Sequence, residues 1–236
     1  MDEILAWLAD PARWSGSDSI PVRVLEHLEL SSVSVLAALA LAVPLGAFIG
    51  HTGHLRLLAV AVANVGRAMP TLALMVIFLP LILRAGLGLG FWPTVAPLVL
   101  LAIPPMLVNT YVGVADVDRD VRDAARGLGM RGHQVLLGVE LPLAAAAIFA
   151  GVRIASVQVI ATATLGALVA SGGLGRYIID GFALQETPRM VAGALLVALL
   201  ALAVDRLLAV LEARSTRAGA NGTTEPRTSG LARSAA

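Results

Sequence analysis

The side chains best suited to polar chemistry are concentrated in residues 116–142, which interrupt an otherwise apolar chain. Arginine and aspartate crowd into and just before this stretch, and glycine recurs in its middle. The charged residues are Arg119, Arg122, Arg126, Arg131, Asp116, Asp118, Asp120 and Asp123. We interpret the stretch as a contact site through which another protein moves the apolar segments.

Several kinds of chemistry are excluded by the residues that the chain lacks. It has no cysteine, so disulfides, thiolate metal sites and cysteine nucleophiles cannot occur. All 17 basic residues are arginine, and a Walker A motif needs a lysine to reach the phosphates of a nucleotide. Any ATPase that drives this chain is therefore another polypeptide. His51 and His54 have no third ligand nearby, so we expect no metal site.

Composition predicts an all-α integral membrane protein. The chain of 236 residues is 58% hydrophobic and 14% charged, whereas about a quarter of the residues of a soluble domain are charged. Several apolar runs reach the roughly 18 residues that cross a bilayer. We expect about five spans, over residues 31–50, 57–83, 95–114, 143–170 and 190–211.

Three regions follow from this division. Residues 1–26 form an extracytoplasmic or interfacial segment, because Trp7 and Trp14 favour the membrane boundary. Residues 27–211 form the transmembrane domain, which contains the polar insert at 116–142. Residues 212–236 are rich in small and polar residues and are expected to be a disordered cytoplasmic tail.

The insert should fold as two short helices joined by a turn. Residues 120–126 favour a helix with acidic residues in its first turn. Gly127, Gly129 and Gly132 break that helix and allow a sharp turn. A second, amphipathic helix over 132–139 leads to Pro142, which suits the first turn of the next span. An ordinary solvated loop is the alternative interpretation.

Arginine counts orient the spans, because arginine and lysine are enriched in cytoplasmic segments. With the N-terminus outside, the inner segments hold ten arginines and the outer segments hold five. The inner residues are Arg56, Arg119, Arg122, Arg126, Arg131, Arg206, Arg214, Arg217, Arg227 and Arg233, and the outer ones are Arg13, Arg23, Arg84, Arg176 and Arg189. The count favours an outside N-terminus, a cytoplasmic C-terminus and a cytoplasmic insert.

Polar residues inside spans are candidates for a transport pathway or its gate. The candidates are Asn64, Arg67, Pro70, Asn109 and Arg153. Asn64 and Arg67 are three residues apart and share a helix face. The alternative interpretation of Arg67 is a packing role, and that of Arg153 is an interhelical hydrogen-bonding role.

The spans contain almost no acidic residues, and Asp205 near the last end is the exception. Ion-coupled transporters usually need an acid within the membrane. The sequence therefore disfavours an ion-coupled carrier. The apolar segments also hold no Ser-His-Asp or paired-carboxylate arrangement, so we expect no enzymatic activity.

The insert resembles a motif of the inner-membrane permeases of binding-protein-dependent ABC importers. That motif reads E-A-A, three residues, G, nine residues, then I-x-L-P. Here Asp123-Ala124-Ala125, Gly129 and Val139-Glu140-Leu141-Pro142 match it with all gaps preserved. The departures are Asp for Glu at 123 and Val for Ile at 139.

The resemblance extends over about residues 27–211 and is similar to the branch that imports glycine betaine, choline and carnitine. It is carried by Ala63-Asn-Val-Gly-Arg-Ala-Met-Pro-Thr71, Val108-Asn-Thr-Tyr-Val-Gly113, Ala150-Gly-Val-Arg153 and Ser171-Gly-Gly-Leu-Gly175. Methionine importer permeases share the Gly-Arg-x-x-Pro and Gly-Gly-Leu-Gly elements. A permease for an amino acid such as methionine is the alternative, and a channel or ion-coupled carrier is a third.

The resemblance implies a type I importer fold in the bacterial inner membrane. The implied partners are ATPase subunits that hold ATP and Mg²⁺, a second permease subunit, an extracytoplasmic binding protein and membrane lipid. This chain itself binds no cofactor, and no nucleic acid is expected. The insert would be the coupling helix that contacts the ATPase. Its implied coupling residues are Asp123, Ala124, Ala125, Gly129, Val139, Leu141 and Pro142.

Overall fold

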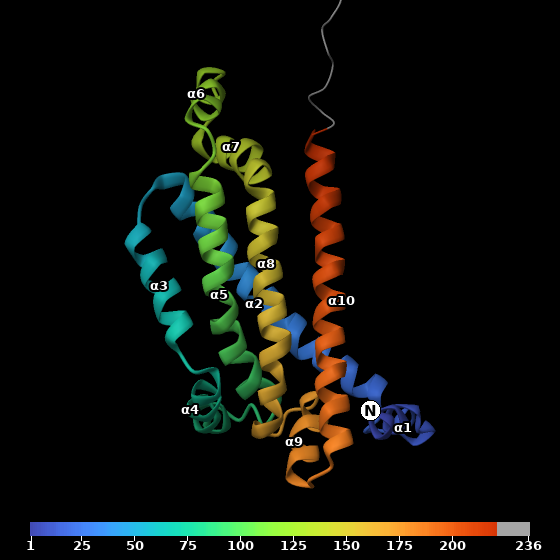
Figure 1. Cartoon of the computed structure of the whole chain (residues 1–236). Helices are drawn as coiled ribbons and strands as arrows, with labels where there is room; N and C mark the ends of the chain where they lie inside the picture. The colour runs from blue at the N-terminus through green and yellow to red at the C-terminus, as the bar shows by residue number, and fades with distance from the viewer. Residues whose placement is uncertain (221–236) are drawn as a thin grey trace, which may run out of the picture.

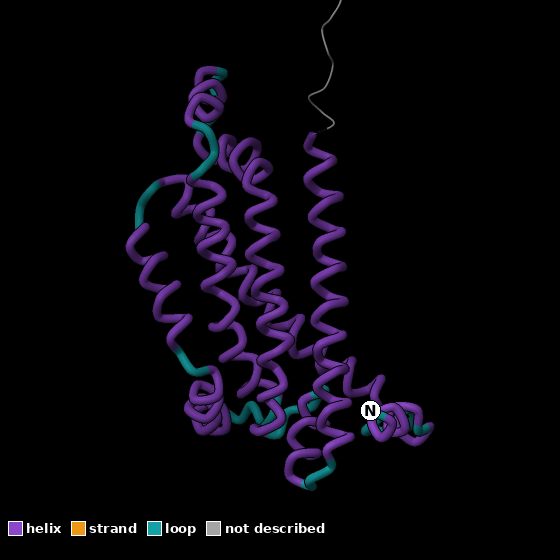
Figure 2. Tube along the Cα trace, in the orientation of Figure 1, coloured by secondary structure: helices purple, strands orange, loops and turns teal. Residues whose placement is uncertain are grey.

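The computed structural model describes residues 1–220, with the side chains of Arg67 and of residues 215–220 excepted. Its helices are α1 (Asp2–Ala9), η1 (Pro11–Arg13), α2 (Ile20–Thr52), α3 (Arg56–Ala68), α4 (Thr71–Arg84), α5 (Phe91–Ala115), α6 (Arg119–Gly127), α7 (Gly132–Val135), the π-helix η2 (Leu136–Glu140), α8 (Leu141–Ala163), η3 (Thr164–Val169), α9 (Gly175–Ala183) and α10 (Thr187–Ala220). Figure 2 shows helices joined by short loops, and no strand occurs among residues 1–220. The predicted all-α class is confirmed.

Four helical segments are long and apolar enough to cross a membrane. They are Ile20–Thr52, Phe91–Ala115, Gly132–Val169 and Thr187–Arg214, and α3 with α4 makes a fifth if the bent pair counts as one span. In Figure 1 the long helices α5, α8 and α10 stand side by side, and α2 crosses behind them. The prediction of about five spans is confirmed.

The second predicted span is not one straight helix. Segments Arg56–Gly66 and Thr71–Arg84 meet at 95°. Met69 is extended, with φ −79° and ψ 121°, because the ring of Pro70 disfavours the helical conformation in the residue before it. Pro70 also lacks the N–H that would continue the helix. The sequence marks the interruption, but the structure shows that it turns α4 aside at one end of the molecule (Figure 1).

Small residues let the central helices approach closely. An added Cβ at Gly46 would lie 2.8 Å from the carbonyl oxygen of Leu107, and one at Gly50 would lie 2.7 Å from Cβ of Val114. Both glycines therefore allow α2 to pack closely against α5. Gly151 of α8 meets α5 in the same way, 2.9 Å from the carbonyl oxygen of Pro105.

The two ends of the molecule carry different elements. Figure 1 shows α6, α7 and the C-terminal end of α10 at one end, and α1, α4 and α9 at the other. Helix α2 begins at Ile20 and so runs continuously across the boundary that we expect near residue 27. Helix α10 continues to Ala220, beyond the expected end of the membrane domain at 211. The rest of the predicted tail, 221–236, lies outside the described residues.

Candidate functional site

The polar insert folds as the sequence predicts. Helix α6 spans Arg119–Gly127, and the carboxylate of Asp118 caps it by accepting a hydrogen bond of 2.8 Å from the backbone N–H of Asp120. Gly129 then turns the chain with φ +87°, a conformation that side chains other than glycine rarely adopt. Helix α7 and the π-helix η2 follow, and Pro142 lies in the first turn of α8.

Helix α6 presents an apolar ridge at the tip of the molecule. Val121 is 41% exposed and Leu128 is 85% exposed, although the helix is otherwise highly polar. Ala124 is exposed between them, and Asp123 beside it exposes 71% of its side chain. Ala125 is only 6% exposed, so it lies on the face of α6 that packs against the rest of the protein. Exposed apolar side chains that are rimmed by charges are typical of a protein docking surface.

The remaining predicted coupling residues lie at the base of the insert. Val139 belongs to η2, and Leu141 and Pro142 open α8. Leu141 packs on a small cluster of buried residues formed by Ala47, Val114 and Ala144. These three predicted residues therefore connect the insert to the membrane helices, whereas Asp123 and Ala124 form part of its exposed surface. Their coupling roles stay predictions.

The pathway candidates are spread over three helices. Asn64 is exposed on α3, and Pro70 forms the bend before α4. The side chain of Arg67 lies outside the described residues. Asn109 of α5 donates a hydrogen bond of 2.8 Å from its side-chain amide to the carbonyl oxygen of Pro105, one turn earlier in the same helix.

Asn109 borders a cavity of about 150 Å³ between α3, α5 and α8. Gly66, Pro105 and Gln158 are among the residues that line it. Gln158 also lines a larger open hollow of about 540 Å³ together with Arg153 and Asp205. The glutamine is exposed on α8, inside a membrane span. It was missed in the sequence because a single neutral amide in an apolar run gives little signal.

Arg153 joins two helices. Its guanidinium lies 3.0 Å from the carboxylate of Asp205 and 3.1 Å from that of Glu212, and both acids belong to α10. Arg153 lies in the fourth predicted span and Asp205 near the end of the fifth. The structure thus brings together two residues that are far apart in the sequence. The interhelical role that we considered for Arg153 is observed. Its position beside the open hollow leaves the pathway role a prediction.

A family model described as a binding-protein-dependent transport system inner membrane component matches residues 42–217. The chain belongs to this family. It is 34% identical over 194 residues to the choline transport system permease protein OpuBB of Bacillus subtilis (strain 168), over 82% of this chain and 87% of that protein. It is 34% identical over 200 residues to the glycine betaine/carnitine/choline transport system permease protein OpuCB of the same strain, over 85% and 90% of the two chains.

Solved structures support the type I fold of this family member. The chain matches the inward-facing MetNI methionine ABC transporter with a TM-score of 0.72, over 89% of this chain and 98% of that chain. The two sequences are 21% identical, so this likeness concerns the fold. Membership of this family makes the chain a multi-pass inner-membrane transport subunit, which removes the channel or ion-coupled carrier from consideration.

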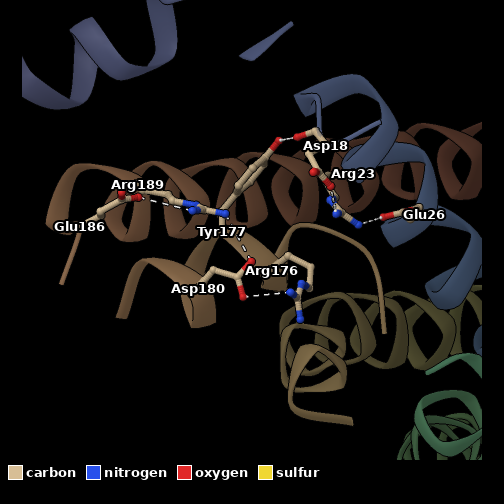
Figure 3. Close-up of polar contacts among 8 residues, drawn as sticks. All are labelled: Asp18, Arg23, Glu26, Arg176, Tyr177, Asp180, Glu186 and Arg189. Carbon is tan, nitrogen blue, oxygen red and sulfur yellow. Dashed lines mark hydrogen bonds and ion pairs between the residues drawn. The ribbon is translucent and has the colours of Figure 1, made fainter. Parts of the chain in front are cut away.

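At the end opposite α6, the transport subunit carries a polar network (Figure 3). Arg23 of α2 pairs with Asp18 and, at 2.8 Å, with Glu26. The hydroxyl of Tyr177 donates a hydrogen bond of 2.6 Å to the carbonyl oxygen of Asp18. Burial raises the pKa of Tyr177, so this hydroxyl stays protonated and remains a donor at neutral pH.

The same network holds the glycine-rich loop after η3. The carboxylate of Glu26 accepts a hydrogen bond of 2.7 Å from the backbone N–H of Gly173. Added Cβ atoms at Gly172 and Gly175 would lie 2.4 Å from Glu26 Oε2 and 2.2 Å from the carbonyl oxygen of Thr164. The glycines of Ser171-Gly-Gly-Leu-Gly175 are therefore needed for close packing against α2 and the end of α8.

Proposed function

We propose that this chain forms the membrane pathway of an ATP-driven importer for small quaternary amines of the choline, glycine betaine and carnitine class. One observation carries the substrate class: the similarity to permeases named for these compounds runs over more than four fifths of the chain. The likeness to MetNI concerns the fold and does not favour methionine. Few aromatic residues lie in the spans, so we assign recognition of the quaternary ammonium to the partner binding protein.

The polar insert is the proposed contact with the ATPase. Its support is the apolar ridge of Val121, Ala124 and Leu128, which stands free at one tip of the molecule. Asp123 lies beside this ridge, Ala125 anchors α6 to the body, and Gly129 sets the angle at which the helix leaves it. ATP and Mg²⁺ bind to the partner, because this chain lacks the lysine of a Walker A motif.

The proposed translocation surface is the exposed side of α5 and α8. Asn109 and Arg153 flank Gln158, which borders both the small cavity and the open hollow. Neutral amide side chains suit a pathway for a permanently cationic substrate, because an uncharged amide neither binds nor repels the cation strongly. A second permease subunit, identical or related, faces this surface and completes the pathway. Asn64, Arg67 and Pro70 belong to the neighbouring gate segment in this proposal.

The proposed orientation puts the N-terminus outside and the insert in the cytoplasm. Three features support it together: the insert and the C-terminal end of α10 lie at one end, α1 lies at the other, and arginine is more frequent in the segments assigned to the inside (Figure 1). The binding protein then approaches the end that carries α9 and the polar network of Figure 3.

Reconstitution tests the function. We expect proteoliposomes that contain this chain, its ATPase and a second permease subunit to accumulate choline or glycine betaine when binding protein and ATP are supplied. Loaded binding protein should also stimulate ATP hydrolysis. L-Methionine in place of the quaternary amine is the control and should not accumulate. Choline uptake by the purified chain without any ATPase would contradict the proposal.

Cysteine labelling tests the orientation, since the natural chain has no cysteine to give background. Ser17 and His133 are both exposed and lie in the N-terminal segment and in α7. We expect a membrane-impermeant maleimide to label Ser17→Cys in intact spheroplasts and His133→Cys only after lysis. The reverse pattern would invert the proposed topology.

A further inference from the structure

A buried carboxylate lies where the insert meets the membrane helices. Glu140 is the last residue of η2 and is 0% exposed. Its Oε2 accepts a hydrogen bond of 2.5 Å from Nδ1 of His51, and its Oε1 lies 3.1 Å from Nε of Arg122. In the resemblance motif Glu140 occupies the unspecified position before Leu-Pro, so the motif gives it no role. It is the only fully buried acid among the described residues.

The two partners of Glu140 come from different parts of the fold. His51 lies in the last turn of α2, and an added Cβ at Gly132 would lie 3.4 Å from its Nε2, so the ring also contacts the start of α7. Arg122 lies in the middle of α6. Its side chain is 14% exposed, although it belongs to the most polar helix of the chain.

Arg122 reaches a third helix as well. Its Nη2 donates hydrogen bonds to the carbonyl oxygens of Val114 and Ala115, the latter at 3.1 Å. These are terminal carbonyls of α5, and that of Val114 also accepts a backbone hydrogen bond from the N–H of Val117 just beyond the helix. A planar guanidinium can bond these carbonyls with one edge and face a carboxylate with another, which a lysine ammonium cannot do at once.

The result is one ionic cluster that ties α6 to the ends of three spans. It connects α6 to α5 directly, to α2 through Glu140 and His51, and to α8 through the backbone that follows Glu140. Its central residue, Glu140, ends a π-helix, an irregular turn that occurs often at functional sites. Apolar packing alone would hold these ends together, so a fully buried charge at this place needs a reason.

We propose that Glu140 is the positioning residue that transmits movement of α6 to α2, α5 and α8. This inference rests on the proposed function, in which the ATPase moves α6. When α6 shifts, the ion pair and the hydrogen bonds of Arg122 oblige the ends of α5 and α2 to shift with it, because separating them would leave a buried carboxylate without its partners. The cluster thereby couples nucleotide binding to the arrangement of the spans.

The test separates transmission from simple stability. Glu140→Gln keeps the shape of the side chain and removes its charge. We expect the complex with the ATPase to assemble and basal ATP hydrolysis to persist, while stimulation by loaded binding protein falls about tenfold, within the range typical of coupling between sites. Arg122→Lys should fall between wild type and Glu140→Gln, because it keeps the charge but not the fork of donors. Transport should fall in parallel with stimulation.

Two further variants complete the design. Glu212→Gln is the matched control, because Glu212 also pairs with an arginine but is partly exposed and joins α10 to α8, where Arg153 keeps its second partner Asp205. It should behave like wild type. The double variant Glu140→Leu with Arg122→Met replaces the charges by apolar bulk, which usually preserves folding. We expect it to be folded, as judged by an unchanged thermal midpoint, and still poorly stimulated.

Each outcome has one meaning. Normal stimulation in Glu140→Gln, or recovery of stimulation in the apolar double variant, would overturn the inference and leave the proposed function intact. Absence of any stimulation in the wild-type complex would instead overturn the proposed function. Loss of stimulation in Glu140→Gln and in the apolar double variant, with the complex assembled and Glu212→Gln normal, would support the transmission role.

Discussion

Replacement of Gly129 by valine is expected to abolish the stimulation of ATP hydrolysis by loaded binding protein while membrane insertion remains intact. Gly129 has φ +87°, where a β-branched residue is strongly disfavoured. The backbone strain would be about 1–3 kcal/mol. No atom lies within 4 Å of an added Cβ, so the backbone conformation and not crowding is the source of the effect. The turn should relax to another conformation and carry α6 out of its docking position.

A pair of alanine variants isolates this cause. An added Cβ at Gly127 also meets nothing within 4 Å, but its φ is not in the left-handed region. Gly129→Ala should therefore reduce stimulated ATP hydrolysis, and Gly127→Ala should leave it nearly unchanged. Transport by Gly129→Val at the wild-type rate would refute the docking role of the insert. Equal losses in the two alanine variants would refute the conformational explanation.

Replacement of Gly175 by alanine is expected to destabilise the fold severely. The new Cβ would lie 2.2 Å from the carbonyl oxygen of Thr164 and 2.7 Å from its Cα. Both are backbone atoms at the junction of α8 and η3, so the clash cannot be relieved by rotation of a side chain. Overpacking of this kind costs about 1–3 kcal/mol and should lower the thermal midpoint in detergent by roughly 5–10 °C.

Gly127→Ala again provides the control, because its Cβ enters open space. Thermal unfolding should be followed by tryptophan fluorescence, and ATP hydrolysis should be measured well below the midpoint. We expect Gly175→Ala to lose stability before it loses coupling, the reverse of Gly129→Val. An unchanged midpoint for Gly175→Ala would mean that η3 can shift away, and would remove the proposed structural role of this glycine.

The insert was largely predictable because its signals are local. Acids at the start of α6, three glycines after it and Pro142 at the next helix each act within a few residues of where they occur. The same holds for Pro70, which marks the break between α3 and α4. The size of that bend was not predictable, because 95° is set by how α4 packs against α5 and η3.

Long-range pairs were not predictable in the same way. Arg153 and Asp205 are each recognisable in the sequence as polar residues of spans, yet nothing in the sequence says that this part of α10 lies beside α8. Glu140 gives a clearer example, since its partners His51 and Arg122 come from either side of it in the chain and at very different separations. The structural consequence of Gly175 likewise appears only when η3 folds against α9.

The sequence by itself determined the membrane class, the helical insert, the absence of an ATP-binding loop and the family. Hydrophobicity, the positions of glycine and proline, and a gapped motif can all be read along the chain without knowledge of its packing. Tertiary structure alone decided which charges meet. A buried carboxylate such as Glu140 is tolerated only where an arginine and a hydrogen-bond donor converge on it, and that convergence depends on the packing of α2, α5, α6 and α8. The polar insert can therefore be predicted from the sequence, but its connection to the spans is visible only in the fold.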